Sequence, residues 1–314
     1  MVDILLATYN GEKYIDEQLK SIINQSYKNW KLYIRDDGSK DNTCDIVEAY
    51  ANNYPDKIIF VKDNKKALGA KLNFGELMKF SKNEYCMFAD QDDVWMDNKV
   101  SKTLEAMKKM ESMHSNITPI LVHTDVTVVD EKLKILNDSF FSFQNIDPKR
   151  NSLKHLILSN TVTGCTMMLN RALMDKIEYI PKDCRMHDWW ISLTASAIGK
   201  IYTINESTML YRQHENNTCG VQKHSDEVNI SRIKTRLKNN IYKQLINDEY
   251  RLNIQQIKQF YNTYIDFLSC EDKAILKSFI DLRNKSYLKR KELIIKNGFF
   301  TGRIKEDIPL FIYL

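Results

Sequence analysis

The sequence predicts an α/β fold, in which a mostly parallel central sheet is flanked by helices and followed by a C-terminal helical extension. Short apolar runs alternate with segments of helical period over residues 1–90, which is typical of a parallel sheet built from strand and helix units. Three of the apolar runs end in polar clusters, at residues 8–10, 36–39 and 90–93. The chain from about residue 225 is almost free of glycine and proline, which favours helices.

Each predicted strand is an apolar run, and each predicted helix carries apolar residues on one face. Ile15, Leu19, Ile22 and Ile23, for example, recur at helical spacing after the turn at residues 8–11. The predicted strands cover residues 2–7, 30–35, 58–61, 85–89, 167–169 and 201–204, the last followed by a return, and the predicted helices cover residues 12–24, 41–52 and 72–80.

The C-terminal part is predicted as two or three helices within residues 230–262 and 270–296. A boundary near residues 219–228 divides the chain into a first domain, residues 1–222, and a helical extension, residues 223–314. Lys and Arg minus Asp and Glu gives 28 − 30 = −2 for residues 1–220 and 18 − 11 = +7 for residues 221–314. The basic character of the extension points to a negatively charged partner surface.

The composition indicates an ordinary globular protein of 314 residues, 43% of them hydrophobic. Six cysteines are scattered without a C-x-x-C pair, which argues against a zinc knuckle or a disulfide framework and favours a reducing compartment. The first ten residues lack the pattern of a signal peptide, and no apolar stretch is long enough to cross a membrane. We therefore expect a cytoplasmic protein.

Carboxylates gather where two predicted strands end. Asp90 and Asp92 stand two residues apart, so their side chains can converge on a hard divalent cation such as Mg²⁺ or Mn²⁺. Asp36 and Asp37 begin a second cluster, and both clusters are also compatible with plain solvated turns. The order of the three clusters along the chain favours one shared pocket for a nucleoside diphosphate.

These residues together resemble the inverting glycosyltransferases of family 2, whose fold is of the glycosyltransferase A type. The resemblance covers most of residues 1–220, through Ala7 to Gly11, Gln25 to Tyr27, Asp36 to Ser39, Gly69, Asn73 and Ala89 to Asp93. It implies that Thr8, Tyr9 and Asp37 hold the base and ribose, that Asp36 supports them, and that Asp92 with Asp90 binds the metal. The nucleotide-binding residues are expected to be Thr8, Tyr9, Asn10, Asp36, Asp37, Gly69, Asn73, Asp90 and Arg212.

The family also implies a catalytic carboxylate about a hundred residues further on, where His187-Asp188-Trp189-Trp190 lies. Asp188 is the expected general base, and its alternative role is to cap a helix. Many relatives have Glu-Asp where this chain has His187-Asp188. The His-Asp-Trp-Trp segment, with Tyr211 to His214, is similar to the rhamnosyltransferase-like subset that makes cell-surface polysaccharides.

The remaining site residues are expected around this centre. His214 is expected to complete the metal site, and Arg212 is expected to bind phosphate, although a surface turn is the alternative for both. Sugar or acceptor contacts are expected from Gly164, Cys165 and His187, and stacking on a sugar ring from Trp95, Trp189 or Trp190. Core packing is the alternative for the aromatic residues and for Cys165.

The expected reaction is the transfer of one sugar with inversion, from dTDP-rhamnose or from a UDP-hexose or UDP-N-acetylhexosamine, to a saccharide or lipid-linked acceptor. A nucleotide-sugar-binding scaffold without turnover is the alternative from another class. No nucleic-acid partner is expected. The basic cluster Lys285, Lys289, Arg290, Lys291 and Lys296, interleaved with apolar residues, indicates either an anionic membrane surface or packing on the catalytic domain or a second subunit.

Overall fold

The computed structural model describes residues 1–215 and 241–314. The predicted boundary between residues 222 and 223, and Cys219, lie outside the described residues. The described chain contains one sheet, with strand order β3-β2-β1-β4-β8-β6-β9-β5 and with β7 paired to β6. Its strands are β1 (Val2–Thr8), β2 (Trp30–Asp36), β3 (Ile58–Val61), β4 (Tyr85–Asp90), β5 (Val94–Trp95), β6 (Ile120–Val129), β7 (Ile135–Asn137), β8 (Met168–Asn170) and β9 (Lys200–Arg212).

The parallel half of the sheet brings the polar clusters to one edge. β1 pairs in parallel with β2 and β4, with Thr8 opposite Asp36 and Ala7 opposite Asp90. β2 continues in parallel to β3, whereas β8 runs antiparallel to β4 and β6. The predicted α/β fold is confirmed, and its strand ends meet where ligands bind in such sheets.

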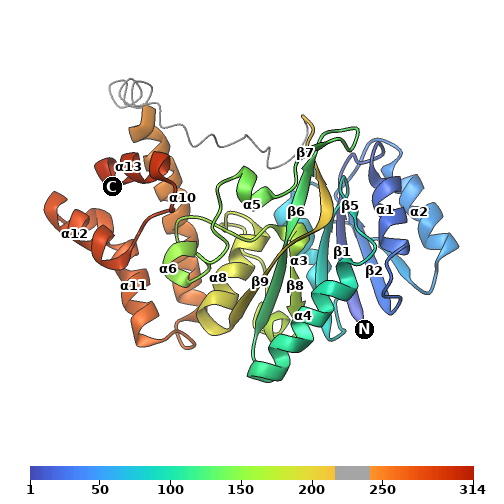
Figure 1. Ribbon diagram of the computed structural model, residues 1–314, viewed down its shortest axis with the longest axis horizontal. Coiled ribbons are helices and arrows are strands. Elements are labelled where there is room, and N and C mark those ends of the chain that lie inside the picture. Colours follow the sequence, from blue (N-terminus) through green and yellow to red (C-terminus); the bar gives the residue numbers. More distant parts are fainter. Residues whose placement is uncertain (216–240) are drawn as a thin grey trace.

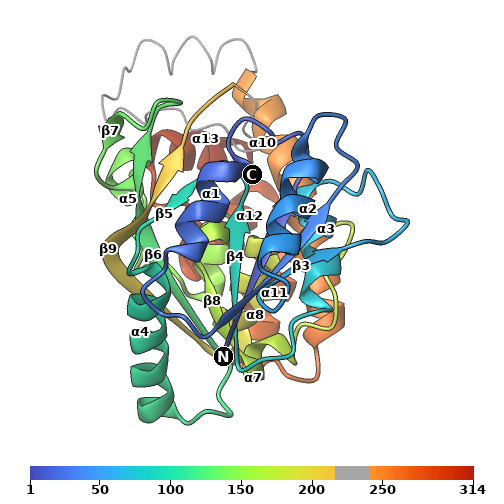
Figure 2. The ribbon, with the colours of Figure 1, turned by 90° about the vertical axis from the view of Figure 1, so that its right-hand side faces the viewer.

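Helices cover both faces of this sheet (Figures 1 and 2). Alternate residues of β1 point to opposite faces, so Ile4 and Leu6 share a core cluster with Leu19 of α1, while Leu5 shares one with Phe74 of α3. The helices of this domain are α1 (Ile15–Ile23), α2 (Thr43–Asn53), α3 (Ala70–Met78), α4 (Lys99–His114), α5 (Phe140–Phe143), α6 (Leu153–Leu156), α7 (Arg171–Met174) and α8 (His187–Ile198), and η1 (Gly164–Thr166) is a single 3₁₀ turn.

One predicted strand proved wrong in its extent. Residues 201–204 were expected to form a short strand followed by a return, but β9 is a single strand of 13 residues, Lys200–Arg212, that runs parallel to β6. No strand was predicted at residues 120–129, which form the fully buried β6. Because β6 offers a long partner, β9 continues along it through register shifts near Thr124 and Asp125.

The C-terminal helices pack on the domain that contains the sheet. They are α10 (Ile241–Tyr264), α11 (Cys270–Ile280), α12 (Tyr287–Asn297) and α13 (Ile304–Tyr313), so residues 270–296 form two helices with the 3₁₀ turn η2 (Leu282–Asn284) between them. The ring of Trp190 in α8 contacts those of Phe260 and Tyr264 in α10, with centroids 5.5 and 5.9 Å apart. Figure 1 shows this extension at the end of the molecule opposite α1 and α2. None of the helices in the described ranges is both long and apolar enough to cross a bilayer.

Candidate active site

A cavity of about 460 Å³ opens at the carboxyl ends of β1, β2 and β4. The start of α8 and the turn η1 close it from the other side. Eight residues that were predicted to bind the nucleotide or the metal or to act as the base line this cavity, namely Thr8, Tyr9, Asp37, Gly69, Asn73, Asp90, Asp92 and Asp188. The sheet topology therefore gathers residues that are up to 180 positions apart in the sequence.

The turn after β2 is built on Asp36. Its carboxylate accepts hydrogen bonds from the Thr8 hydroxyl (2.8 Å), the Ser39 hydroxyl (2.5 Å) and the backbone N–H groups of Gly38 and Ser39 (2.9 and 2.7 Å). Burial favours the neutral acid, but these hydrogen bonds outweigh it and lower the pKa of Asp36. Asp36 does not line the cavity. It is a supporting residue, as the resemblance implies, and not a direct ligand.

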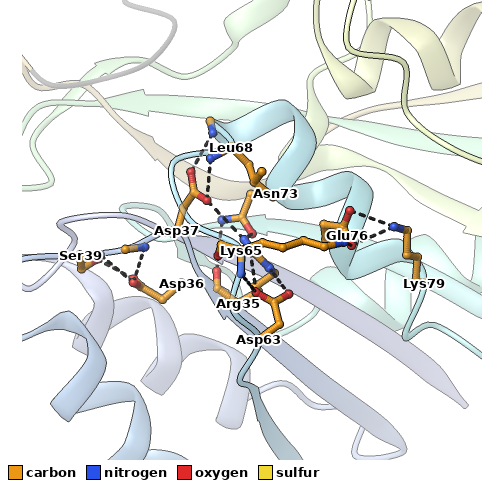
Figure 3. Close-up of polar contacts among 12 residues, drawn as sticks. Arg35, Asp36, Asp37, Ser39, Asp63, Lys65, Leu68, Asn73, Glu76 and Lys79 are labelled. Carbon is orange, nitrogen blue, oxygen red and sulfur yellow. Dashed lines mark hydrogen bonds and ion pairs between the residues drawn. The ribbon is translucent and has the colours of Figure 1, made fainter.

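Asp37 lines the cavity, and two backbone N–H groups fix its carboxylate. Its two carboxylate oxygens accept hydrogen bonds from the backbone N–H groups of Leu68 (3.0 Å) and Gly69 (2.7 Å) (Figure 3). Gly69 has a φ of +76°, a conformation that other residues rarely adopt. The glycine thus lets the loop present two donors to Asp37.

Arg35 is a supporting residue that the sequence reading missed. Its buried guanidinium pairs with Asp63 (2.9 Å), lies 3.4 Å from an oxygen of Asp37, and donates to the side-chain oxygen of Asn73 (2.8 Å) (Figure 3). The Asn73 amide nitrogen donates back to the Arg35 carbonyl (3.2 Å). Asn73 therefore positions Arg35 and α3, although it also lines the cavity. The available signal was an arginine at the end of an otherwise apolar strand.

A second missed residue, Gln91, joins the loops after β1 and β4. Its side chain accepts a hydrogen bond from the Tyr9 N–H (2.8 Å) and donates one to the Tyr9 carbonyl (2.9 Å). A Cβ at Gly11 would lie 2.3 Å from the Gln91 side chain, which explains why glycine stands there. Asn10, by contrast, contacts Ser39 and Lys40 and is not on the cavity, so its contact with the nucleotide stays a prediction.

Carboxylates crowd the centre of the cavity. Burial, together with the charges of Asp92 and Asp188, raises the pKa of Asp90 to about 7. Asp92 forms a 2.8 Å contact with Nε2 of His214, whose ring lies 4.9 Å from that of Tyr14. Neighbouring carboxylates and an imidazole are a suitable donor set for Mg²⁺ or Mn²⁺, because a cation relieves their mutual repulsion. Asp90, Asp92 and His214 would hold it.

A second acidic cluster lies one layer deeper. Ligand atoms of Asp90, Asp93 and Cys165 lie within 4.8 Å of one another, but Asp93 and Cys165 are buried and neither lines the cavity. Burial raises the pKa of the Cys165 thiol well above its usual value, so the thiol stays protonated. Lys99, also fully buried, adds positive charge nearby. This layer supports the carboxylates and is a poor cation site, and Cys165 is not a sugar contact.

Asp188 lies in the first turn of α8 and lines the cavity. Met186 occupies the N-cap position of α8, and Asp188, two residues later, still satisfies a free backbone N–H of the first turn. Its carboxylate accepts a hydrogen bond from the Trp189 N–H (2.6 Å). Burial raises the pKa of Asp188 to about 7, which suits a group that must take up a proton near neutral pH.

His187 lies beside Asp188 in a nearly dry place. Its ring is 4% exposed and packs on Phe74 and Phe88, with centroids 4.2 and 5.5 Å away. Within the described residues neither ring nitrogen has a hydrogen-bond partner, and burial lowers the pKa of His187 to about 3. The imidazole is therefore neutral. A Cβ at Gly164 would lie 2.9 Å from its Nε2, so Gly164 is needed for the ring to fit.

Arg212, predicted to contact phosphate, supports the loops beside the cavity. The guanidinium donates to the carbonyls of Asp92 (2.8 Å) and Glu131 (2.6 Å), forms an ion pair with Glu17, and lies 4.6 Å from the ring centre of Tyr14. Arg212 is buried and does not line the cavity. It fixes the loop that carries Asp92 because the loop's carbonyls need buried donors.

The tryptophans lie away from the cavity. Trp190 is fully buried under α10, and Trp95 is 3% exposed and packs beneath Lys99. Stacking of either ring on a sugar is therefore wrong, since packing demands in the core decide these positions. Trp189 is half-buried, donates its ring N–H to the Leu156 carbonyl (2.6 Å) and carries the Arg185 guanidinium 5.2 Å from its ring centre. It does not line the cavity either.

The sequence of this chain matches a known protein family. Residues 3–177 match the model of glycosyl transferase family 2. The chain belongs to that family. Among curated proteins, a 228-residue stretch is 31% identical to the dTDP-rhamnosyl transferase RfbG of Shigella flexneri, covering 68% of this chain and 73% of the relative.

Two solved structures share the fold of this family 2 member. S. aureus TarS, residues 1–349, in complex with UDP-GlcNAc superposes with a TM-score of 0.55 at 16% identity, covering 99% of this chain and 90% of TarS. The mannosyltransferase PcManGT from Pyrobaculum calidifontis, in complex with GDP-Man and Mn²⁺, gives 0.53 at 13% identity, covering 99% and 86%. These coverages include the C-terminal helices, so the glycosyltransferase A type fold is confirmed.

Proposed function

We propose that this family 2 glycosyltransferase moves one sugar from a nucleotide-diphosphate donor to a saccharide or lipid-linked acceptor with inversion, in the synthesis of a cell-surface polysaccharide. The observation that carries the proposal is the position of Asp188, which lines the same cavity as Asp90 and Asp92 and has a pKa raised to about 7. One carboxylate is enough for an inverting transfer, because no covalent intermediate forms.

In the proposed reaction, one side of the cavity activates the acceptor and the other holds the donor. Asp188 takes the proton of an acceptor hydroxyl, whose oxygen forms the new bond to the anomeric carbon. The bond from that carbon to the diphosphate breaks, and the diphosphate leaves with the electron pair. Asp90, Asp92 and His214 would hold a divalent cation, and that cation would neutralise charge on the leaving diphosphate. Thr8, Tyr9 and Asp37 hold the nucleoside, positioned by Asp36, Arg35 and Gln91.

The surroundings of Asp188 favour a donor sugar with apolar character. Phe74, Met186 and the neutral His187 line the cavity beside it, so a sugar with a methyl group at C5 buries that group against carbon. We therefore propose dTDP-rhamnose as the donor, in line with the rhamnosyl transferase relative. A UDP-hexose or UDP-N-acetylhexosamine is the second candidate, and the UDP-GlcNAc complex of TarS supports it. The uncharged His187 is proposed to hydrogen-bond one sugar hydroxyl.

A donor panel tests this proposal. Release of nucleoside diphosphate is measured with dTDP-rhamnose, UDP-glucose and UDP-N-acetylglucosamine, with and without Mg²⁺ or Mn²⁺, and the anomeric configuration of the product is read by NMR. Metal-dependent release from one donor and an inverted product support the proposal. Tight donor binding without turnover for every donor and acceptor would favour a binding scaffold, and a retained configuration would refute the single-carboxylate mechanism.

A further inference from the structure

Helix α13 carries a stripe of exposed isoleucines. Ile304, Ile308 and Ile312 follow one another at four-residue spacing and are 64, 39 and 40% exposed, while Pro309 and Leu310 on the other side are buried. Residues four apart share one side of a helix. Helix α13 therefore has two apolar sides, one packed in the core and one facing outward.

Helix α12 extends this stripe. Leu288 and Ile295, 79 and 62% exposed, lie three residues before and four residues after Lys291, on the same side of the helix. The ammonium group of Lys291 donates to the carbonyls of Phe311 and Ile312 at the end of α13. Lys291 thus ties α12 to the C-terminal end of α13. We call the exposed apolar residues of these two helices, Leu288, Ile295, Ile304, Ile308 and Ile312, the α12–α13 surface.

Basic residues flank this surface. Lys285 and Lys296 are exposed just before and on α12, whereas the exposed Lys289 pairs with Glu292 (2.7 Å). Residues 285–314 contain seven Lys and Arg against three Asp and Glu, 7 − 3 = +4. Two of those acids serve the fold of α13, because Glu306 pairs with Arg303 (2.8 Å) and Asp307 accepts hydrogen bonds from Thr301. Apolar side chains beside an excess of cations match an anionic lipid surface. A second copy of the same surface would instead bring like charges together.

We propose that the α12–α13 surface docks on an anionic lipid bilayer, with its isoleucines and Leu288 at the boundary of the acyl chains and its lysines among the headgroups. In Figures 1 and 2, α13 lies toward the end of the molecule at which β1 finishes, opposite the N-terminus. The cavity opens at that same end. Docking through α13 thus involves the same end of the molecule as the cavity, which fits a lipid-linked acceptor. The lipid-linked acceptor belongs to the proposed function, but the docking itself does not depend on it.

Vesicle flotation of the full chain tests the docking. The protein is floated with vesicles of phosphatidylcholine alone and with an equal mixture of phosphatidylcholine and phosphatidylglycerol, at low and high salt. We expect binding to the anionic vesicles that weakens as salt rises. Ile304→Ser combined with Ile308→Ser abolishes it, whereas the control pair Met113→Ser and Ile117→Ser, 63 and 81% exposed near the C-terminal end of α4 and just after it, leaves it unchanged.

A second pair of double variants tests the contribution of the basic residues to docking. Lys285→Gln with Lys296→Gln weakens binding by on the order of 30-fold, whereas Lys108→Gln with Lys109→Gln on α4 leaves binding unchanged. Nucleoside diphosphate release without vesicles is the same in all these variants, which separates a failure of docking from a failure of the proposed function. Equal binding to neutral vesicles, no binding to either kind, or a dimer in solution that the isoleucine variant makes monomeric would overturn the proposal. The last result would make this surface an interface between two copies of the chain.

Discussion

One added methyl group at Gly164 tests whether the position of Asp188 sets the rate of transfer. In Gly164→Ala the new Cβ would lie 2.9 Å from Nε2 and 3.2 Å from Cε1 of His187, and 3.6 Å from Cβ of Asp188. Ordinary contacts begin at 3.4 Å, so the imidazole must retreat by about 0.5 Å. Phe74 already packs 4.2 Å away from the imidazole, centroid to centroid, so the start of α8 moves with the ring.

The expected result is a fall in kcat of roughly 10-fold to 100-fold, because a displacement of about 1 Å can cost two orders of magnitude. Overpacking should also lower the free energy of unfolding by about 1–3 kcal/mol. Donor affinity should fall by no more than a few fold, because Thr8, Tyr9 and Asp37 hold the nucleoside at the other side of the cavity and only the proposed contact of His187 with one sugar hydroxyl is disturbed. Steady-state diphosphate release, calorimetric donor binding and thermal unfolding measure the three quantities separately.

Two variants make this experiment decisive. Gly75→Ala places a Cβ 3.1 Å from Ile180, a comparable steric load that does not touch α8, and should lower stability more than kcat. His187→Ala combined with Gly164→Ala removes the clash and should recover part of the rate lost by Gly164→Ala alone. Full activity in Gly164→Ala, or equal losses in Gly164→Ala and Gly75→Ala, would refute the reasoning.

Two further predictions concern the carboxylates. Chelation by EDTA and the substitution Asp92→Ala should each abolish transfer while thermal unfolding shows an intact fold, since the diphosphate then departs without charge neutralisation; full activity in EDTA would remove the metal from the account. Because burial raises the pKa of Asp188 to about 7, and only the ionised base accepts a proton, kcat/KM should fall with decreasing pH through a limb at or below about pH 7, displaced downward by the charge of a bound cation. A profile that stays flat down to pH 5, measured with a saturating divalent cation, would contradict this assignment.

The sequence predicted the parallel half of the fold and the strand ends well, because both depend on local patterns. Apolar runs flanked by turn residues identify β1 to β4, and the parallel register then forces Thr8, Asp36 and Asp90 to one edge. The strands β6 and β9 were harder to predict. A ten-residue strand that is buried throughout shows no alternation, and β9 becomes long only because β6 lies beside it.

The parts of the site that were missed depend on tertiary contacts. Nothing near Arg212 in the sequence shows that its guanidinium is used by the carbonyls of Asp92 and Glu131. Trp190 follows Asp188 closely, yet a helix turns by about 100° per residue, so it faces α10 and not the cavity. Likewise, the roles of Gly164 and Gln91 appear only when the distances to His187 and Tyr9 are known.

The central claim, that Asp188 is the general base of a transfer reaction, is tested most directly by Asp188→Asn with binding and turnover measured on the same preparation. The substitution keeps the size of the side chain and removes its ability to take a proton. Donor affinity should stay within a few fold, and the rate of transfer to the acceptor should fall by roughly 10² to 10⁴. Near-normal turnover in Asp188→Asn would contradict the account, and so would a loss of donor binding large enough to explain the lost rate.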